Sequence, residues 1–191
     1  MEDKRILKTK LKLKRALVDL LEEKPFEKIN VTELCNRASV SRITFYTYYS
    51  NKHELVDEYL KDMQKEVIAG VQQKDKINNK NDDPIIDFDN VLDTLMDLYV
   101  DNKRFFRHVD WEDSPYLFSA HYRYVLDSVE EFARKSKNIE CNYSLDTVIS
   151  FICNGLWGIL RNYRKRGVIP DKVREETKMM LKDILESNFF K

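Results

Sequence analysis

Hydrophobic residues recur every three or four positions along most of this chain, which is the period of an amphipathic helix. The clearest stripes lie in residues 7–21, 145–163 and 173–185. Pro84, Pro115 and Pro170 each open a further segment with this period, and proline is tolerated in the first turn of a helix. Only 4 Gly and 4 Pro occur in 191 residues, too few for the many tight turns of a sheet protein. We therefore predict an all-α protein of about nine helices.

Start and stop signals delimit the helices near the N-terminus. The first predicted helix covers residues 4–24 and ends before Pro25. Asn30 followed by Glu33 predicts a capping box for a helix over 31–38, and Ser41 can cap another helix that ends near residue 48. Two short helices joined by a tight turn, with a longer helix on each side, are the outline of a helix-turn-helix unit.

A fourth helix is expected to begin at Lys52, after Ser50-Asn51, and to end near Gln72. Residues 74–83 (KDKINNKNDD) contain one apolar residue in ten, so we expect a linker or loop there. Farther along, Arg164-Lys165-Arg166-Gly167 places three cations and a glycine after the stripe of residues 145–163 and predicts the end of that helix.

Residues 31–55 (VTELCNRASVSRITFYTYYSNKHEL) carry the most specific motif of the chain. This segment resembles the N-terminal DNA-binding domain of TetR/AcrR-type transcriptional regulators. The family often has glycine where this chain has Ser39 and Ile43. The residues that fit its pattern are Val40, Ser41, Thr44, Phe45, Tyr46, Tyr49, Lys52 and Leu55. The resemblance implies a DNA-binding domain over residues 1–55, with the helix-turn-helix at about 31–50, and a ligand-sensing and dimerisation domain over 56–191.

The predicted recognition helix carries side chains suited to DNA. Arg42, Ile43 and Thr44 lie near its start, where side chains approach base edges: arginine can bridge O6 and N7 of guanine, and the methyl groups of the other two can touch a thymine methyl. Donors farther along the chain are expected to hold phosphates, namely Tyr46, Thr47, Tyr48 and Lys52. The resemblance adds Thr32 as a further DNA contact. Phe45 and Tyr49 are expected to pack in the core.

Charge is distributed unevenly although the chain as a whole is neutral. Residues 1–55 hold 12 Lys or Arg against 8 Asp or Glu, and the remaining residues hold 21 against 25. Seven of the basic residues lie between Lys4 and Arg15. This basic run is either a solvated helix face or the flank of the DNA-binding domain, where it would approach phosphates. The asymmetry favours a protein that is oriented by a polyanion.

The resemblance also implies that the C-terminal domain forms a homodimer through its last two helices and surrounds a pocket for a small effector. Packing within one chain is the alternative for those helices, and plain core packing is the alternative for the aromatic residues of 105–124. The expected dimer interface comprises Ile152, Gly155, Leu156, Ile159, Met180 and Ile184. The expected pocket comprises Phe105, His108, Trp111, Phe118, His121 and Tyr122.

Other classes of function find little support in the sequence. Phosphate-loop, dinucleotide, nucleophile-elbow and zincin motifs are missing, so we predict neither an enzyme nor a cofactor. The histidines and acidic residues of 105–124 match no metal-ligand spacing. Cys35, Cys141 and Cys153 are far apart and are expected to be reduced thiols rather than a redox switch. No segment is apolar enough to span a membrane, and a cytoplasmic protein is expected.

The sequence thus predicts a DNA-binding transcriptional regulator. A repressor that binds a palindromic double-stranded operator as a homodimer and responds to a small-molecule inducer or co-repressor is the leading hypothesis. The alternative is a co-activator or adaptor of the same fold that acts mainly through protein partners.

Overall fold

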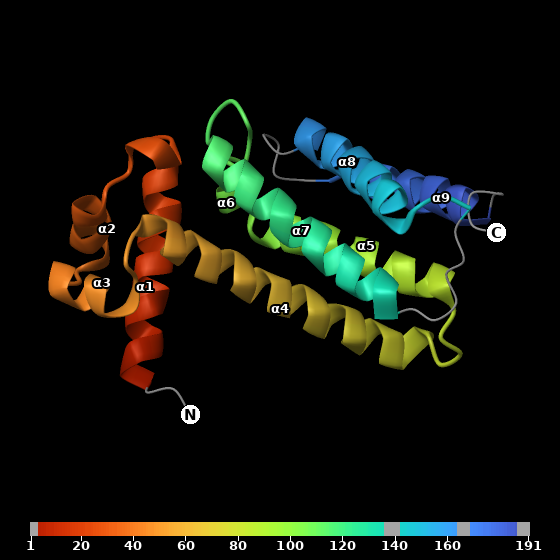
Figure 1. Ribbon diagram of the computed structural model, residues 1–191, viewed down its shortest axis with the longest axis horizontal. Helices are drawn as coiled ribbons and strands as arrows, with labels where there is room; N and C mark the ends of the chain where they lie inside the picture. Colours follow the sequence, from red (N-terminus) through yellow and green to blue (C-terminus); the bar gives the residue numbers. More distant parts are fainter. Residues whose placement is uncertain (1–3, 136–141, 164–168, 187–191) are drawn as a thin grey trace. The chain divides into compact units, whose positions relative to one another are not determined.

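The computed structural model in Figure 1 describes residues 4–135, 142–163 and 169–186, and all regular secondary structure in these residues is helical. This confirms the all-α prediction. A short 3₁₀ turn, η1 (Phe26–Lys28), follows the first helix. The nine α-helices of the described residues are α1 (Lys4–Leu21), α2 (Val31–Ala38), α3 (Arg42–Tyr48), α4 (Lys52–Asn78), α5 (Pro84–Asp101), α6 (Lys103–Phe106), α7 (Pro115–Lys135), α8 (Leu145–Tyr163) and α9 (Asp171–Glu186).

The chain folds into two compact units. The first contains the residues up to Asp62 together with Arg104–His121, and the second contains Met63–Lys103 and the residues from Tyr122 onward. The division therefore falls inside α4, and the α6–α7 region contributes to the first unit. The predicted functional boundary between residues 55 and 56 stays a prediction.

The core of the first unit forms where α1 packs against α2 and the chain ahead of α4. Leu13 and Leu17 of α1, Leu34 of α2, Phe45 of α3 and Leu55 of α4 are all completely buried. Burial of such side chains stabilises a fold by about 1.5–3 kcal/mol each relative to exposure. The predicted stripe of α1 is thus confirmed over its second half, whereas its first two leucines, at positions 7 and 11, are exposed.

In the second unit α5 contacts three other helices. The hydroxyl of Tyr99 on α5 donates to the carbonyl of Leu160 on α8 at 3.2 Å. Arg174 of α9 forms ion pairs with α5 carboxylates, described below. Toward α4, a Cβ added at Gly70 would lie 2.7 Å from the methyl of Thr94, so the two helices approach too closely there for any larger residue.

The end of α4 corrects the expected linker. Residues 74–78 are helical, and the chain leaves the helix only after Asn78. Asn90 of α5 is buried and donates to Asp75 at 2.7 Å and to Asn78 at 2.8 Å, while Asn78 donates back to Asn90 at 2.9 Å. Polar composition misled the prediction because these side chains find partners on another helix, which the sequence does not display.

Two features of the sequence lie outside the described residues: Cys141 and the predicted stop signal Arg164–Gly167. Cys35 and Cys153 are buried, and burial raises the pKa of both thiols, that of Cys153 to about 11. Among the described helices, none has both the length and the apolar character needed to cross a bilayer.

His121 makes the first unit sensitive to acid. It is buried, its ring lies edge-on to Phe106 at 5.0 Å, and burial lowers its pKa from 6.5 to about 4. Between pH 6.5 and pH 4 the unfolded chain therefore binds a proton at this histidine that the folded chain does not bind. The free energy of unfolding is highest above pH 6.5 and decreases as the pH falls from 6.5 toward 4. We expect the free energy of unfolding to fall by about 2 kcal/mol from this group between pH 8 and pH 5.

Urea unfolding at both pH values, compared with the His121→Phe variant, measures this contribution. The variant removes the titrating group and keeps a ring beside Phe106, so its stability is expected to change less with pH. An equal change with pH in both proteins would contradict the assignment.

Candidate nucleic-acid interface

The helix-turn-helix begins with the capping box predicted at α2. The side-chain oxygen of Asn30 accepts from the amide of Glu33 at 3.0 Å, and the Glu33 carboxylate accepts from the amide of Asn30 at 3.0 Å. Lys24, at the end of α1, donates to the same carboxylate. These hydrogen bonds, first from Lys24 and then from the Asn30 backbone, lower the pKa of Glu33. One carboxylate therefore starts α2 and ties it to the chain that leaves α1.

The turn between α2 and α3 explains one departure from the family pattern. Ser39 ends α2 in the left-handed region, with φ 52°, and the amide of Val40 donates to the carbonyl of Cys35 at 2.9 Å. Glycine adopts this backbone conformation without steric cost, so it is the favoured residue at such a helix end. Serine preserves the turn at an expense of about 1–2 kcal/mol in backbone strain.

Ser41 starts the recognition helix α3. Its hydroxyl oxygen accepts from the amide of Thr44 at 3.0 Å and lies 2.8 Å from the Thr44 hydroxyl. On the inner side of α3, Phe45 and Tyr49 are buried, as predicted for core residues. The cap and these two rings fix the helix, and thereby decide which side chains it presents outward.

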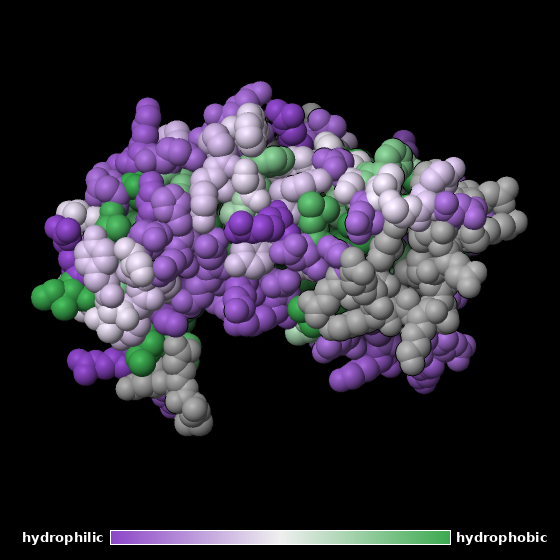
Figure 2. Space-filling model, viewed as in Figure 1, coloured by the Kyte–Doolittle hydropathy of each residue, from purple (hydrophilic) through white to green (hydrophobic). Residues whose placement is uncertain are grey.

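The outer side of α3 presents four of the residues predicted to contact DNA. Arg42, Ile43, Tyr46 and Thr47 line one shallow, open hollow, and the surface over α2 and α3 mixes hydrophilic and hydrophobic side chains in Figure 2. Ile43 is 83% exposed, Tyr46 is 50% exposed, and the Arg42 guanidinium lies 5.9 Å from the centre of the Tyr46 ring. In this arrangement the four side chains could enter one groove of a DNA duplex together.

The other predicted contacts are placed differently. Thr32 is exposed on α2, Thr44 is half-buried with its hydroxyl engaged by Ser41, and Tyr48 is half-buried. Lys52 points into the protein: its ammonium donates to the carbonyls of Phe26 (2.7 Å), Glu27 (3.1 Å) and Ile29 (2.7 Å). All three of its protons are thus used on the connection between α1 and α2.

Lys52 is also surrounded by aromatic and acidic groups. Its ammonium lies 4.4 Å from the centre of the Phe26 ring, a cation–π contact. Burial lowers the pKa of Lys52, partly offset by the nearby carboxylates of Glu27 and Glu33. Lys52 therefore acts here as a positioning residue for the connection before α2, and the sequence offers no sign of this role because its acceptors are backbone carbonyls.

The basic run of α1 divides between two environments. Lys14 is buried and forms ion pairs with Glu58 (2.9 Å) and Asp62 (2.5 Å) of α4, and Lys10 pairs with Glu58 at 3.3 Å. Burial raises the pKa of Glu58, but hydrogen bonding and attraction from Lys14 outweigh it, and the pKa is lowered. Lys8, Lys12 and Arg15 are exposed. For these residues and the first residues of α1, a solvated helix face and a contact with DNA phosphates both remain as alternatives. Glu58 and Asp62 are four residues apart and therefore lie on one face of α4, which is the sequence signal that could have indicated this pairing.

The α6–α7 region contacts the two segments that flank the helix-turn-helix, η1 and the start of α4. The ring of Tyr116 stacks on Phe26 at 5.3 Å and meets His53 edge-on at 4.4 Å, while its hydroxyl donates to Asp57 at 3.1 Å. The amide of Phe26 donates to the hydroxyl of Ser114 at 3.1 Å. Phe26 thus contacts both Lys52 and the start of α7.

The predicted pocket residues of the first unit have individual partners. Phe105 is buried edge-on to Tyr59 at 5.0 Å and, like His121, contacts Phe106. His108 lies 3.3 Å from a carboxylate oxygen of Glu22, in the turn that follows α1. These contacts are those of core and surface packing, which was the alternative for this aromatic segment.

The remaining pocket candidates lie apart from that group. Trp111 is 62% exposed, and Phe118 meets its ring edge-on at 6.0 Å. Tyr122 belongs to the second unit, where its hydroxyl accepts from Asn154 at 2.6 Å. An effector site at these residues stays a prediction. In the described ranges, no three His, Cys, Asp or Glu side chains gather closely enough to hold a metal ion.

Part of the predicted dimer interface is exposed on α8. A Cβ added at Gly155 or Gly158 would meet nothing within 4 Å in the described part of the chain, so neither glycine serves a close approach there. Phe151, which was not predicted, is 60% exposed on the same helix. Ile152, next to Phe151, is buried within the single chain, and its place in a dimer interface stays a prediction.

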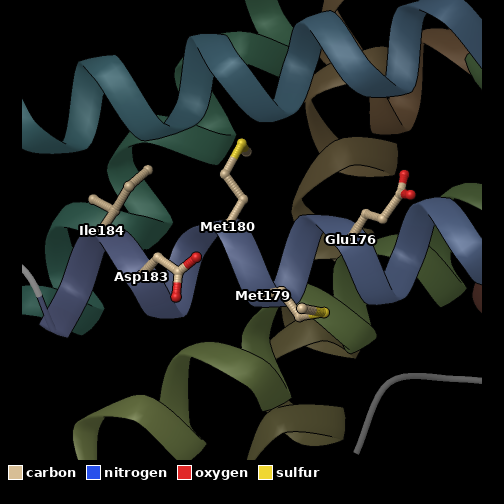
Figure 3. Close-up of a pocket in the computed structure, with 5 residues that line it drawn as sticks. All are labelled: Glu176, Met179, Met180, Asp183 and Ile184. Atoms are coloured by element: carbon tan, nitrogen blue, oxygen red, sulfur yellow. The ribbon is translucent and has the colours of Figure 1, made fainter.

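On α9, Met180 is 45% exposed and Ile184 is half-buried, and both extend from the same side of the helix in Figure 3. They line a shallow hollow with Glu176, Met179 and Asp183. The opposite side of α9 is held to α5: Arg174 pairs with Asp93 (3.2 Å) and Asp97 (2.9 Å). The side with the methionines therefore faces outward.

Comparison with known proteins identifies the helix-turn-helix part of the first unit. Residues 14–59 match the family model described as bacterial regulatory proteins, tetR family. These residues form a TetR-family helix-turn-helix domain. A curated relative of this chain is YxbF, an uncharacterized helix-turn-helix transcriptional regulator of Bacillus subtilis strain 168, with 31% identity over 67 residues. That match spans 35% of this chain and only 18% of the relative.

Solved structures of other proteins, including TetR-family regulators, share the fold over nearly the whole chain. A putative TetR-family regulator from Syntrophomonas wolfei has a TM-score of 0.75 at 15% identity and covers 94% of this chain and 95% of its own. A TetR regulator from Streptococcus agalactiae has a TM-score of 0.63 at 19% identity, covering 94% and 96%. The dihydroxyacetone kinase operon activator DhaS has a TM-score of 0.58 at 22% identity, covering 96% and 98%.

Lys52 supports a prediction about the TetR-family domain. Replacement by Met keeps the length of the side chain but leaves three carbonyls without their charged donor, so we expect Lys52→Met to lower the free energy of unfolding by roughly 2 kcal/mol. Thermal and urea unfolding measure the change. Lys28→Met, at an exposed lysine in η1, is the matched control and is expected to alter stability by less than about 0.5 kcal/mol. Equal losses in the two variants would contradict the positioning role.

Proposed function

We propose that this protein is a transcriptional regulator that binds double-stranded operator DNA as a homodimer and releases or retains it in response to a small effector. The observation that carries the proposal is the exposed row of Arg42, Ile43, Tyr46 and Thr47 on the recognition helix of a TetR-family domain. Base contacts would come from the first two of these residues, and phosphate contacts from Tyr46 and Thr47 together with Thr32 and Tyr48.

Dimerisation is supported by the outward sides of α8 and α9. Phe151, Met179 and Met180 are exposed apolar side chains, and the open surface at Gly155 and Gly158 leaves room for a helix of a second copy. Leu156, Ile159 and Ile184, each half-buried in the single chain, would complete such an interface. A dimer places two recognition helices on one duplex, so a palindromic operator follows from its symmetry.

The route from effector to DNA is supported by contacts inside the first unit. Tyr116 at the start of α7 stacks on Phe26, and Phe26 lies against the ammonium of Lys52, which holds the chain ahead of α2. A change in the α6–α7 region would reach the recognition helix through these contacts. Coupling of the usual allosteric size, about 1–3 kcal/mol, changes operator affinity roughly 5- to 150-fold.

A co-activator or adaptor that works through protein partners is the second candidate. The observation that favours it is the exposure of Ile43, since a large apolar side chain on a surface also suits a protein interface. Repression and activation are both compatible with binding an operator, and the fold neighbour DhaS is named as an activator. We place the protein in the cytoplasm, where its proposed DNA partner lies.

DNA binding is tested by selecting duplexes from a random pool with the purified protein and measuring affinity by fluorescence anisotropy. We expect a palindromic consensus, and we expect Arg42→Ala to weaken binding to it about 10- to 100-fold, because a bidentate contact to guanine is lost. Arg104→Ala, at an exposed arginine of α6, is the control and is expected to bind as the parent does. Failure to enrich any duplex would overturn the proposal in favour of a protein partner.

The dimer is tested at Met180. We expect Met180→Glu to shift the protein toward monomer in analytical ultracentrifugation and to weaken operator binding at least tenfold, because a buried unpaired carboxylate disrupts an apolar interface. Met180→Leu keeps the size and apolar character at the same position and is expected to remain dimeric. A Met180→Glu protein that stays dimeric would show that this side of α9 is not the interface.

A further inference from the structure

The most exposed large apolar side chain of the described residues lies on the recognition helix. Ile43 is 83% exposed, whereas Phe45, two positions later on the same helix, is completely buried. A single exposed isoleucine is common on protein surfaces and proves nothing alone. Its neighbours make this one informative, because it shares a shallow hollow with Arg42, Tyr46 and Thr47.

The hydroxyl groups next to Ile43 are occupied within the protein. The Thr47 hydroxyl donates to the carbonyl of Ile43 at 2.9 Å, and the Thr44 hydroxyl is 2.8 Å from that of Ser41, the helix cap. In the protein without DNA, the Thr47 proton is used within α3, and Thr44 and Ser41 share one hydrogen bond in which either hydroxyl can be the donor. What α3 presents beside Ile43 is the cationic Arg42 and the ring and hydroxyl of Tyr46.

This combination of a bare aliphatic group and an adjacent cation fits one partner chemistry. DNA is a polyanion, and Arg42 supplies charge complementarity to it. In the major groove, base edges present hydrogen-bonding atoms with one apolar exception, the 5-methyl group of thymine. An apolar protein partner offers no anionic group to pair with the guanidinium beside Ile43.

We propose that Ile43 reads thymine in each operator half-site by packing on its 5-methyl group, next to the base or phosphate contacted by Arg42. The inference rests on the proposed function and deepens it by naming the base chemistry that is recognised. Ile43 is then a specificity-determining residue at the position where the family often has glycine.

The experiment uses the duplex selected by the full-length protein. Each thymine of a half-site is replaced in turn by deoxyuridine, which pairs identically with adenine and lacks only the methyl group. We expect one position, repeated by symmetry in the other half-site, at which this replacement weakens binding about threefold to tenfold, the loss that accompanies exposure of one or two buried methyl equivalents.

The Ile43→Ala variant completes the cycle. It is expected to bind the thymine duplex and the deoxyuridine duplex with equal affinity, because its side chain no longer reaches the methyl group. Ile43→Val, which keeps a branched side chain, is the matched control and is expected to retain part of the discrimination. The exposure of Ile43 means that neither change removes a core contact, and circular dichroism verifies the fold.

Three results overturn the inference. Equal binding of every deoxyuridine duplex by the parent protein refutes thymine recognition while leaving the proposed DNA binding intact. Undiminished discrimination by Ile43→Ala assigns the methyl contact to another residue. Failure of the parent protein to bind any duplex refutes the proposed function itself, and with it the inference.

Discussion

The arrangement of the helix-turn-helix depends on one ammonium group. Lys52 begins α4, and its three hydrogen bonds go to the carbonyls of residues 26, 27 and 29, in the connection that α1 and α2 share. That connection leads into the capping box at Asn30, and the capping box into α2 and the turn before the recognition helix. Because these elements follow one another without a long loop, the direction of α3 is set by how firmly the connection is held. A charged donor to several carbonyls holds it better than the packing of one ring would.

The same connection is contacted from its other side. Phe26 is completely buried, with the Lys52 ammonium against its ring, the Tyr116 ring stacked on it and the Ser114 hydroxyl on its amide. His53 joins this group, and burial, followed by the charge of Lys52, lowers its pKa. Phe26 therefore contacts both the α6–α7 region and the lysine that holds the connection into the helix-turn-helix. Such sharing gives the proposed effector response a physical route, since a shift of Tyr116 cannot leave the environment of Phe26 unchanged.

The sequence predicted what local rules govern. Apolar spacing located the helices, Asn30 and Ser41 were recognised as caps, and Phe45 and Tyr49 were assigned to the core. It could not predict partners from distant parts of the chain: Lys14 with Glu58, Asn78 with Asn90, and Lys52 with backbone carbonyls. Those contacts made a basic stripe partly internal and extended α4 through residues 74–78, the first half of the expected linker. The apolar pattern also did not distinguish the exposed Phe151 from the buried Ile152, which are neighbours on α8. The effector prediction relied on aromatic density, which core packing produces equally well.

The internal pairing of lysines also alters how the protein would meet DNA energetically. Association between a protein and a duplex draws much of its free energy from counterions that cationic side chains displace from phosphates. At least five of the 12 cations in residues 1–55 already have partners within the folded chain before any duplex arrives: Lys10, Lys14, Lys24, Arg37 and Lys52. Contacts that the neutral hydroxyls of Tyr46 and Thr32 would make with phosphates displace no counterions. A domain built this way gains proportionately more of its affinity from the shape and chemistry of the site, and less from the mere presence of a polyanion.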